Sequence, residues 1–298
     1  MSSSPFEPCI PVGPVQCGTL VARDADAVVR AYRESLDLVV ISDGPLPKAL
    51  ATAWGQSDLA GARFVVLGAD ATDASTHWLR VIEWPLAEAP LPMRHSGWLA
   101  LEVLVKDVCA LGQRLENGPF TVLGPPRALA VNDNIWAMQV AGPAGETLYL
   151  TEVRAPVPPF DLPAPATFTA ERLFIPVLSA REHSTAMGWY EQLSGQAGLR
   201  FDTRVSALNA ALGLDPEWRR PVGTLQLAGA SMIEIDHVPE HSGAPACASG
   251  LPSGLAMVSF HARRDVALPP GTTWQAHGAT AVALMQGPAG EWIELLAP

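Results

Sequence analysis

Three acidic residues in the C-terminal part of the chain stand where strand alternation would bring their side chains together. In the segment SMIEIDHV, Glu234 and Asp236 share one strand face with Met232, and in EWIELL, near the end of the chain, Glu294 shares a face with Trp292. Carboxylates that converge on one cavity can hold a hard cation or act as general acids and bases, since their repulsion raises the pKa of at least one. We therefore predict a catalytic group of Glu294, Glu234 and Asp236. The alternative is that one or more of them lies at the cavity rim, where water solvates it.

The first half of the chain offers a smaller polar pair. In GWLALEVLV, alternation turns Glu102 to the same side as Trp98 and Ala100, and in GETLYLTEV it places Tyr149 on the face of the two threonines. Glu102 and Tyr149 could form an acid/base pair or a structural hydrogen bond, and aromatic side chains suit the wall of a small-molecule cavity. The predicted substrate-binding residues are Trp292, Met232, Leu255, Met257, Trp98, Glu102 and Tyr149.

The elements that must position these residues are written twice. GPAGETLYL begins at Gly142, and GPAGEWIELL repeats its turn and strand from Gly287. Between the two copies, the proline-rich segment 154–170 reads as a linker, because proline holds the chain extended and removes backbone donors. The predicted domains are therefore residues 12–153 and 171–298.

Each half reads as two modules of one strand, one helix and three strands. Asp24 is a suitable N-cap for a helix in DADAVVRAYRESLD, and KDVCALGQRLENG has helical apolar spacing that ends near Gly118. At the corresponding place in the second half, RRDVALPPG is too short and too rich in proline for more than a turn. The pattern predicts an α+β fold of four βαβββ modules, the last with its helix cut short.

The composition excludes several classes of partner. A formal net charge of -11 and a pI near 5.0 disfavour nucleic acids and anionic membrane surfaces, which require clustered lysine and arginine. The four cysteines show no CxxC spacing, and His77, His237 and His261 are isolated in the sequence, so neither a zinc cluster nor a disulfide framework is indicated. We expect a cytoplasmic protein with a small-molecule ligand or substrate, and a homo-oligomer stays open.

The paired modules, the phrase RAYRESLDL after the first strand and GPAGEWIELL in the last resemble the vicinal oxygen chelate superfamily, which includes glyoxalase I, bleomycin-binding proteins and extradiol dioxygenases. The resemblance implies two tandem glyoxalase-like domains, each a curved mixed sheet around a cavity with helices outside. It also implies a divalent metal held by His, Gln or Glu from the first and last strands of the modules. Glu294 matches the last-strand ligand and Tyr149 stands at the equivalent place in the first half, while the other ligand positions are matched to Cys17, Trp98, Ile175 and Leu255.

These matches predict that the usual metal site, with its histidines, is missing. No cofactor is expected, and a divalent metal at Glu234, Asp236 and Glu294 is the less favoured reading. The resemblance then implies a small-molecule enzyme, a lyase or isomerase of an oxygenated organic substrate, with its site in the second domain and extradiol dioxygenase chemistry disfavoured. The alternative is a non-catalytic protein that binds or sequesters an apolar or aromatic small molecule.

Overall fold

The computed structural model describes residues 10–129, 132–243, 245–247 and 250–298, and these form two eight-stranded mixed sheets. Sheet 1 has the strand order β14-β15-β16-β13-β1-β4-β3-β2, and sheet 2 has the order β10-β11-β12-β9-β5-β8-β7-β6. Both sheets are curved, and together with a small number of helices they give the predicted α+β fold. Within the described residues, no helix is both long and apolar enough to span a membrane.

Four modules follow one another along the chain, as predicted. The first comprises β1 (Val12–Ala22), α1 (Ala25–Leu36), β2 (Val39–Pro45), β3 (Arg63–Gly68) and β4 (His77–Glu83). The second comprises β5 (Gly97–Val105), α3 (Val108–Leu115), β6 (Thr121–Leu129), β7 (Asn132–Ala141) and β8 (Thr147–Val153). The third comprises β9 (Ala170–Ala180), α4 (His183–Ser194), β10 (Leu199–Thr203), β11 (Arg220–Leu227) and β12 (Ser231–His237). The fourth has strands only: β13 (Gly254–Ala262), β14 (Gln275–His277), β15 (Thr280–Gln286) and β16 (Trp292–Ala297).

The local signals for helices are confirmed. The Asp24 side chain accepts a hydrogen bond from the Ala27 backbone N–H at 2.9 Å and so caps α1, and α3 lies where the apolar spacing placed it. A short helix absent from the sequence expectations, α2 (Lys48–Ala53), lies between β2 and β3, and α5 (Ser206–Leu212) occupies the same connection in the third module. Helix α2 packs against sheet 1 and fills its inner face, whereas α5 lies beside a cavity on sheet 2.

The pairing of modules crosses the middle of the chain. Strand β1 pairs antiparallel with β13, and β5 pairs antiparallel with β9, so sheet 1 contains the first and fourth modules while sheet 2 contains the second and third. The segments 12–153 and 171–298 therefore each contribute one module to each sheet. The sequence suggested that the two modules of each half would share one sheet, whereas the structure divides them between the two sheets.

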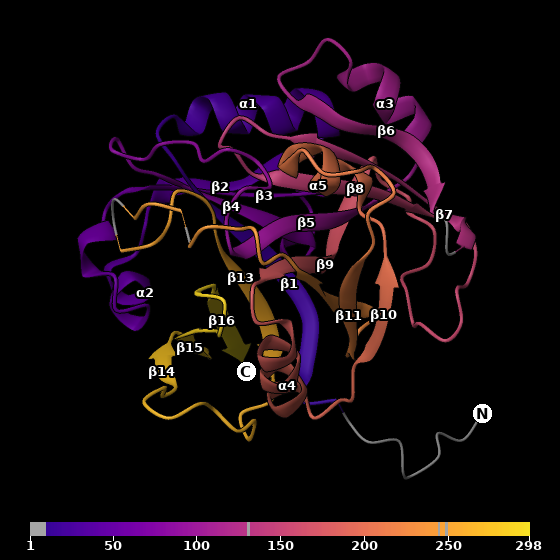
Figure 1. Cartoon of the computed structure of the whole chain (residues 1–298). Helices are drawn as coiled ribbons and strands as arrows, with labels where there is room; N and C mark the ends of the chain where they lie inside the picture. Colours follow the sequence, from indigo (N-terminus) through magenta and orange to yellow (C-terminus); the bar gives the residue numbers. More distant parts are fainter. Residues whose placement is uncertain (1–9, 130–131, 244, 248–249) are drawn as a thin grey trace, which may run out of the picture.

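A shared core fills the space between the two sheets. Figure 1 shows α1 and α3 at one end of the molecule and α4 at the other, with the first strands of the modules crossing between them. The strands approach so closely that a Cβ atom at Gly18 of β1 would lie 2.4 Å from the Leu101 side chain of β5. Any larger residue here would force the Leu101 side chain to shift, so the close contact of the two sheets favours glycine at this position.

The repeated GPAGE turn ties these layers together. In the first copy, the buried Glu146 carboxylate accepts hydrogen bonds from the Tyr32 hydroxyl of α1 at 2.7 Å and from the Ala144 N–H at 2.9 Å. A Cβ atom at Gly142 would lie 1.9 Å from the glutamate oxygen, and Gly145 has a φ of +81°, so both glycines are needed for the glutamate to fold back.

The second copy repeats this arrangement: Glu291 accepts from the Tyr190 hydroxyl of α4 at 2.7 Å and from the Ala289 N–H at 2.9 Å. In each half, the helix of one module is therefore hydrogen-bonded to the last turn of the next module, which belongs to the other sheet. The repeated GPAGE turn therefore connects the two sheets in the same way at two places.

Candidate functional site

The concave face of sheet 1 is filled by protein. Helix α2 and the segments on either side of it place five residues against the sheet in one apolar cluster: Leu46, Leu50, Ala51, Trp54 and Leu59. Met257 is fully buried in this cluster, and Trp292 and Leu296 pack against it. Met257 and Trp292, which we predict to bind substrate, serve here as core residues beneath α2.

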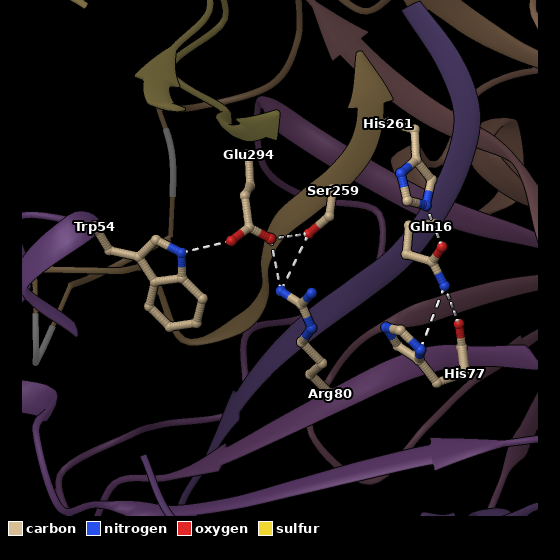
Figure 2. Close-up of polar contacts among 7 residues, drawn as sticks. All are labelled: Gln16, Trp54, His77, Arg80, Ser259, His261 and Glu294. Carbon is tan, nitrogen blue, oxygen red and sulfur yellow. Dashed lines mark hydrogen bonds and ion pairs between the residues drawn. The ribbon is translucent and has the colours of Figure 1, made fainter. Parts of the chain in front are cut away.

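Glu294 lies in this filled face and is held by donors from three elements (Figure 2). Its Oε2 accepts from Arg80 Nη1 of β4 at 2.6 Å and from the Ser259 hydroxyl of β13, and its Oε1 accepts from the indole N–H of Trp54 at 2.6 Å. The Glu294 side chain is fully buried and that of Arg80 is 10% exposed, so this ion pair is shielded from water. An arginine thus neutralises the carboxylate that we predict to be catalytic.

The polar cluster extends from Arg80 along β1. Gln16 donates from its amide nitrogen to the His77 carbonyl at 2.8 Å, and its amide oxygen lies 2.6 Å from His261 Nε2 (Figure 2). Burial lowers the pKa of His261, and the positive charge of Arg80 acts in the same direction, so this imidazole is neutral at pH 7 and donates to Gln16. His77 and His261, isolated in the sequence, are thus joined through Gln16.

The concave face of sheet 2 retains a cavity of about 220 Å³. Its polar lining comes from Glu102 of β5, Gln139 of β7, Tyr149 of β8 and Glu234 of β12. Apolar lining is provided by Ala128, Leu129, Ala137, Phe201, Val205 and Ala207, and Arg127 and Arg204 contribute two cationic side chains. Helix α5 covers one side of this cavity without filling it.

Hydrogen bonding within this cavity is incomplete. The Glu102 carboxylate accepts a hydrogen bond from the Thr151 hydroxyl at 2.7 Å. Tyr149 is only 6% exposed, and its hydroxyl has no hydrogen-bond partner among the described residues. Both carboxylate oxygens of Asp236, next to Glu234 on the same face of β12, are likewise buried without a partner in the described chain. Buried polar groups are nearly always paired, so the Tyr149 hydroxyl in the cavity lining is available to hydrogen-bond a ligand.

Burial raises the pKa of each carboxyl group here, and neighbouring carboxyl groups raise the pKa of Glu234 and of Glu102 further. Burial raises the pKa of Glu234, and the nearby charges of Asp236 and Glu102 raise it further. Burial also raises the pKa of Glu102, against the hydrogen bond from Thr151, and that of Asp236, against the positive charge of Arg220. Burial and the three carboxyl groups keep the Tyr149 phenol protonated by raising its pKa. Groups of this kind can exchange protons near neutral pH.

The predicted grouping of the three catalytic carboxylates is wrong. Glu234 and Asp236 lie in sheet 2 with Glu102 and Tyr149, whereas Glu294 lies in sheet 1 with Arg80. The reason is the crossed pairing of modules: β12 belongs to the third module and β16 to the fourth, and these enter different sheets. Within the described part of the chain, Glu234, Asp236 and Glu294 do not form a group that could hold a metal ion.

Three predicted binding residues also lie away from the cavity. Trp98 and Leu255 face the core between the sheets, where the Trp98 indole donates to the Trp292 carbonyl at 2.7 Å. A register irregularity between Trp98 and Ala100 breaks the alternation that placed Trp98 beside Glu102. Met232 lies on the predicted face of β12, but Phe160 and Leu162 of the proline-rich segment pack against the apolar cluster that buries it.

Strand register identifies equivalent positions in the two sheets. In sheet 1, Glu294 pairs with Ser259, Ser259 with Cys17, and the next row places Arg80 on β4. In sheet 2, the matching row is Tyr149, Glu102 and Ile175, with Glu234 on β12 in the place of Arg80. The matches for Cys17 and Ile175 thus fall in these rows, but Ser259 and Glu102, rather than Leu255 and Trp98, stand beside them.

The residues at these positions do not fit the divalent metal that the fold family implies. In sheet 1, the guanidinium of Arg80 already binds Glu294, and burial raises the pKa of the Cys17 thiol, which keeps it protonated. In sheet 2, the row contains a phenol and an isoleucine beside Glu102. Across the described residues, no group of three or more His, Cys, Asp or Glu side chains is arranged to hold a metal ion.

Sequence reasoning missed Arg80, Ser259 and Trp54. Arg80 carried a usable signal, because a charged residue inside the apolar strand HWLRVIEW has to find a buried partner. Ser259 and Trp54 carried none, since a serine in a strand and a tryptophan after a helix are compatible with many surroundings.

Comparisons with known proteins identify the fold. No family model matches the sequence, and no curated protein matches it significantly. Among solved structures, glyoxalase I from Zea mays superimposes with a TM-score of 0.60 at 13% identity, over 95% of this chain and 92% of that one. A putative dioxygenase from Bacillus subtilis superimposes with a TM-score of 0.64 at 11% identity, over 97% of this chain and 86% of that one. With its four modules and two curved sheets, the chain has the vicinal oxygen chelate fold over nearly its whole length.

Proposed function

We propose that this chain is a small-molecule enzyme that transfers protons on an oxygenated organic substrate, as a lyase or isomerase does, and that the reaction takes place in the cavity of sheet 2. The observation that carries the proposal is that Glu102 and Glu234 line one cavity with the Tyr149 hydroxyl, which has no partner among the described residues, while Asp236 lies near Glu234 behind the lining. This revises the predicted location, because Glu294 is locked in an ion pair beneath α2.

Each group has a chemical role in such a reaction. Glu102 and Glu234 line the cavity, and their raised pKa values suit one to accept a proton while the other donates one. The Tyr149 hydroxyl is an uncharged donor in a buried wall, where it can stabilise negative charge that develops on a substrate oxygen. Asp236 keeps the pKa of Glu234 high.

Proton exchange tests this proposal without knowledge of the full reaction. Small hydroxyketones and 2-oxoacids are incubated with the protein in D₂O, and loss of the C–H signal beside the carbonyl is followed by ¹H NMR. We expect wild type to exceed the buffer rate with at least one compound, and Glu102→Gln and Glu234→Gln each to lower the rate by about 10²-fold or more. Glu88→Gln changes a carboxylate whose side chain is 85% exposed, and it should retain the wild-type rate.

A second function is favoured by the apolar wall of the same cavity. Phe201, Leu129 and Val205 could hold a flat, apolar compound without catalysis. In that case no compound would exchange faster than in buffer, and an aromatic ligand would bind Glu102→Gln as tightly as wild type. That pair of results would replace the enzyme with a binding protein.

A further inference from the structure

The inner faces of the two sheets both contain carboxyl groups, but the charges beside these groups differ. In sheet 1, a central carboxylate, Glu294, stands opposite Arg80, whose guanidinium lies 2.6 Å from it and 3.4 Å from the Ser259 hydroxyl. Glu234 occupies the equivalent position to Arg80 in sheet 2, because both residues lie across from the same place on the first strand of the neighbouring module. At this one strand position, the arginine of sheet 1 is therefore replaced by a carboxyl group in sheet 2.

Sheet 2 offers these carboxyl groups little compensating positive charge. Arg220 opposes the raised pKa of Asp236, but its own hydrogen bonds go to the Asn209 side chain at 2.7 Å and to the His237 carbonyl at 3.1 Å. Arg204 forms an ion pair with Glu217. Arg127 is exposed to solvent, which screens its charge. Arg220 is thus the one buried arginine whose charge reaches Asp236, but among the described residues no ion pair to Glu102, Glu234 or Asp236 matches that of Arg80 with Glu294.

The cavity lining also contains buried polar oxygens that have no hydrogen-bond partner among the described residues. The Tyr149 hydroxyl lines the cavity, is buried and has no partner among the described residues, and the Gln139 side-chain oxygen in the same lining is also buried without one. Both oxygens can accept a hydrogen bond from an N–H group, as the hydroxyl of Ser259 is placed to do from Arg80. The cavity therefore presents acceptors with no donor of the chain's own directed at them.

We propose that the cavity of sheet 2 takes a small organic cation, a molecule with a guanidinium or protonated amine group that lies among Glu102, Glu234 and Tyr149 as Arg80 lies against Glu294 and Ser259. This inference rests on the proposed function, and it names the substrate class for that site. A planar guanidinium donates up to five hydrogen bonds and suits paired carboxylates better than a compact ammonium does. Binding of the cation also favours ionisation of the neighbouring carboxyl groups, which makes one of them available as a base.

The test compares a cation with its uncharged isostere. Binding of n-butylguanidinium and n-butylurea to the full-length protein is measured by calorimetry at pH 7.5 and about 0.15 M salt, where long-range attraction to the net negative protein is screened. We expect the guanidinium to bind at least about ten-fold more tightly than the urea, and Glu102→Gln and Glu234→Gln each to remove most of that preference. Glu88→Gln should leave the preference intact.

Several results would overturn the proposal. These are equal affinity for the two probes, tighter binding of butanoate than of butylguanidinium, or a cation preference that survives both glutamine variants. Should either variant melt at a lower temperature, Tyr149→Phe provides a second test, because it keeps all the carboxyl groups and should weaken guanidinium binding only modestly. If the cation fails to bind while Glu102→Gln still abolishes proton exchange, the proposed function stands and this inference alone is wrong.

Discussion

At the scale of single residues, the molecule contrasts a carboxylate that is neutralised with carboxylates that are not. The two carboxylate oxygens of Glu294 accept three hydrogen bonds, from Arg80, Ser259 and Trp54, so the protein itself already occupies this group. Glu102 is buried and Glu234 is partly buried, and neither has an arginine partner among the described residues, so they keep the capacity to exchange protons.

The Arg80–Glu294 pair yields a stability prediction. Arg80→Ala should lower the free energy of unfolding by about 3–5 kcal/mol, because it leaves Glu294 as an uncompensated buried charge. Arg154→Ala removes a more exposed arginine from Glu152 and should cost less than about 1 kcal/mol. Urea unfolding followed by circular dichroism measures both changes. Equal, small losses in the two variants would contradict the role given to Arg80.

At the scale of elements, the repeated GPAGE turn carries a pH dependence. Burial raises the pKa of Glu146 and of Glu291 to about 7, against the hydrogen bonds from Tyr32 and Tyr190. A carboxyl group whose pKa is higher in the folded state than in the unfolded chain contributes stability at low pH and loses it as pH rises toward the folded value. From these two groups, the free energy of unfolding should therefore increase as pH falls from about 7.5 to about 5.

This pH effect can be assigned to the turns by substitution. The double variant Glu146→Gln and Glu291→Gln should show a flatter dependence of unfolding free energy on pH over that window, since an amide does not titrate. The carboxyl groups of the sheet 2 cavity contribute in the same direction, so part of the slope should remain. An unchanged slope in the double variant would show that the two turn glutamates do not titrate in this range.

At the scale of the whole molecule, the crossed pairing makes each half of the chain dependent on the other. Residues 12–153 expressed alone would leave β1 without β13 and β5 without β9, so both sheets would be cut along their central strands. We expect either half alone to be insoluble or to form dimers, and co-expression of the two halves to restore a soluble complex. Size-exclusion chromatography with circular dichroism tests this. A folded, monomeric half would contradict the dependence.

The sequence by itself determined the modules and their local structure. Strand alternation, the Asp24 cap of α1, the apolar spacing of α3 and the repeated GPAGE turn are short-range features, and their physical causes act within a few residues. For the same reason the inward face of β12 was predictable, and with it the placement of Glu234 and Asp236 on one side.

Only the tertiary structure decided which carboxylates meet. Two modules with similar first strands can pair within a half or across the halves, and the choice depends on contacts between segments far apart in the sequence, such as Gly18 against Leu101 and Cys17 beside Ser259. The crossed choice separates Glu294 from Glu234 and Asp236, and it brings Glu102 and Tyr149 to them instead. The filling of one cavity by Trp54 and its neighbours is equally long-range, because a short helix shows its apolar face in the sequence but not the sheet that it covers.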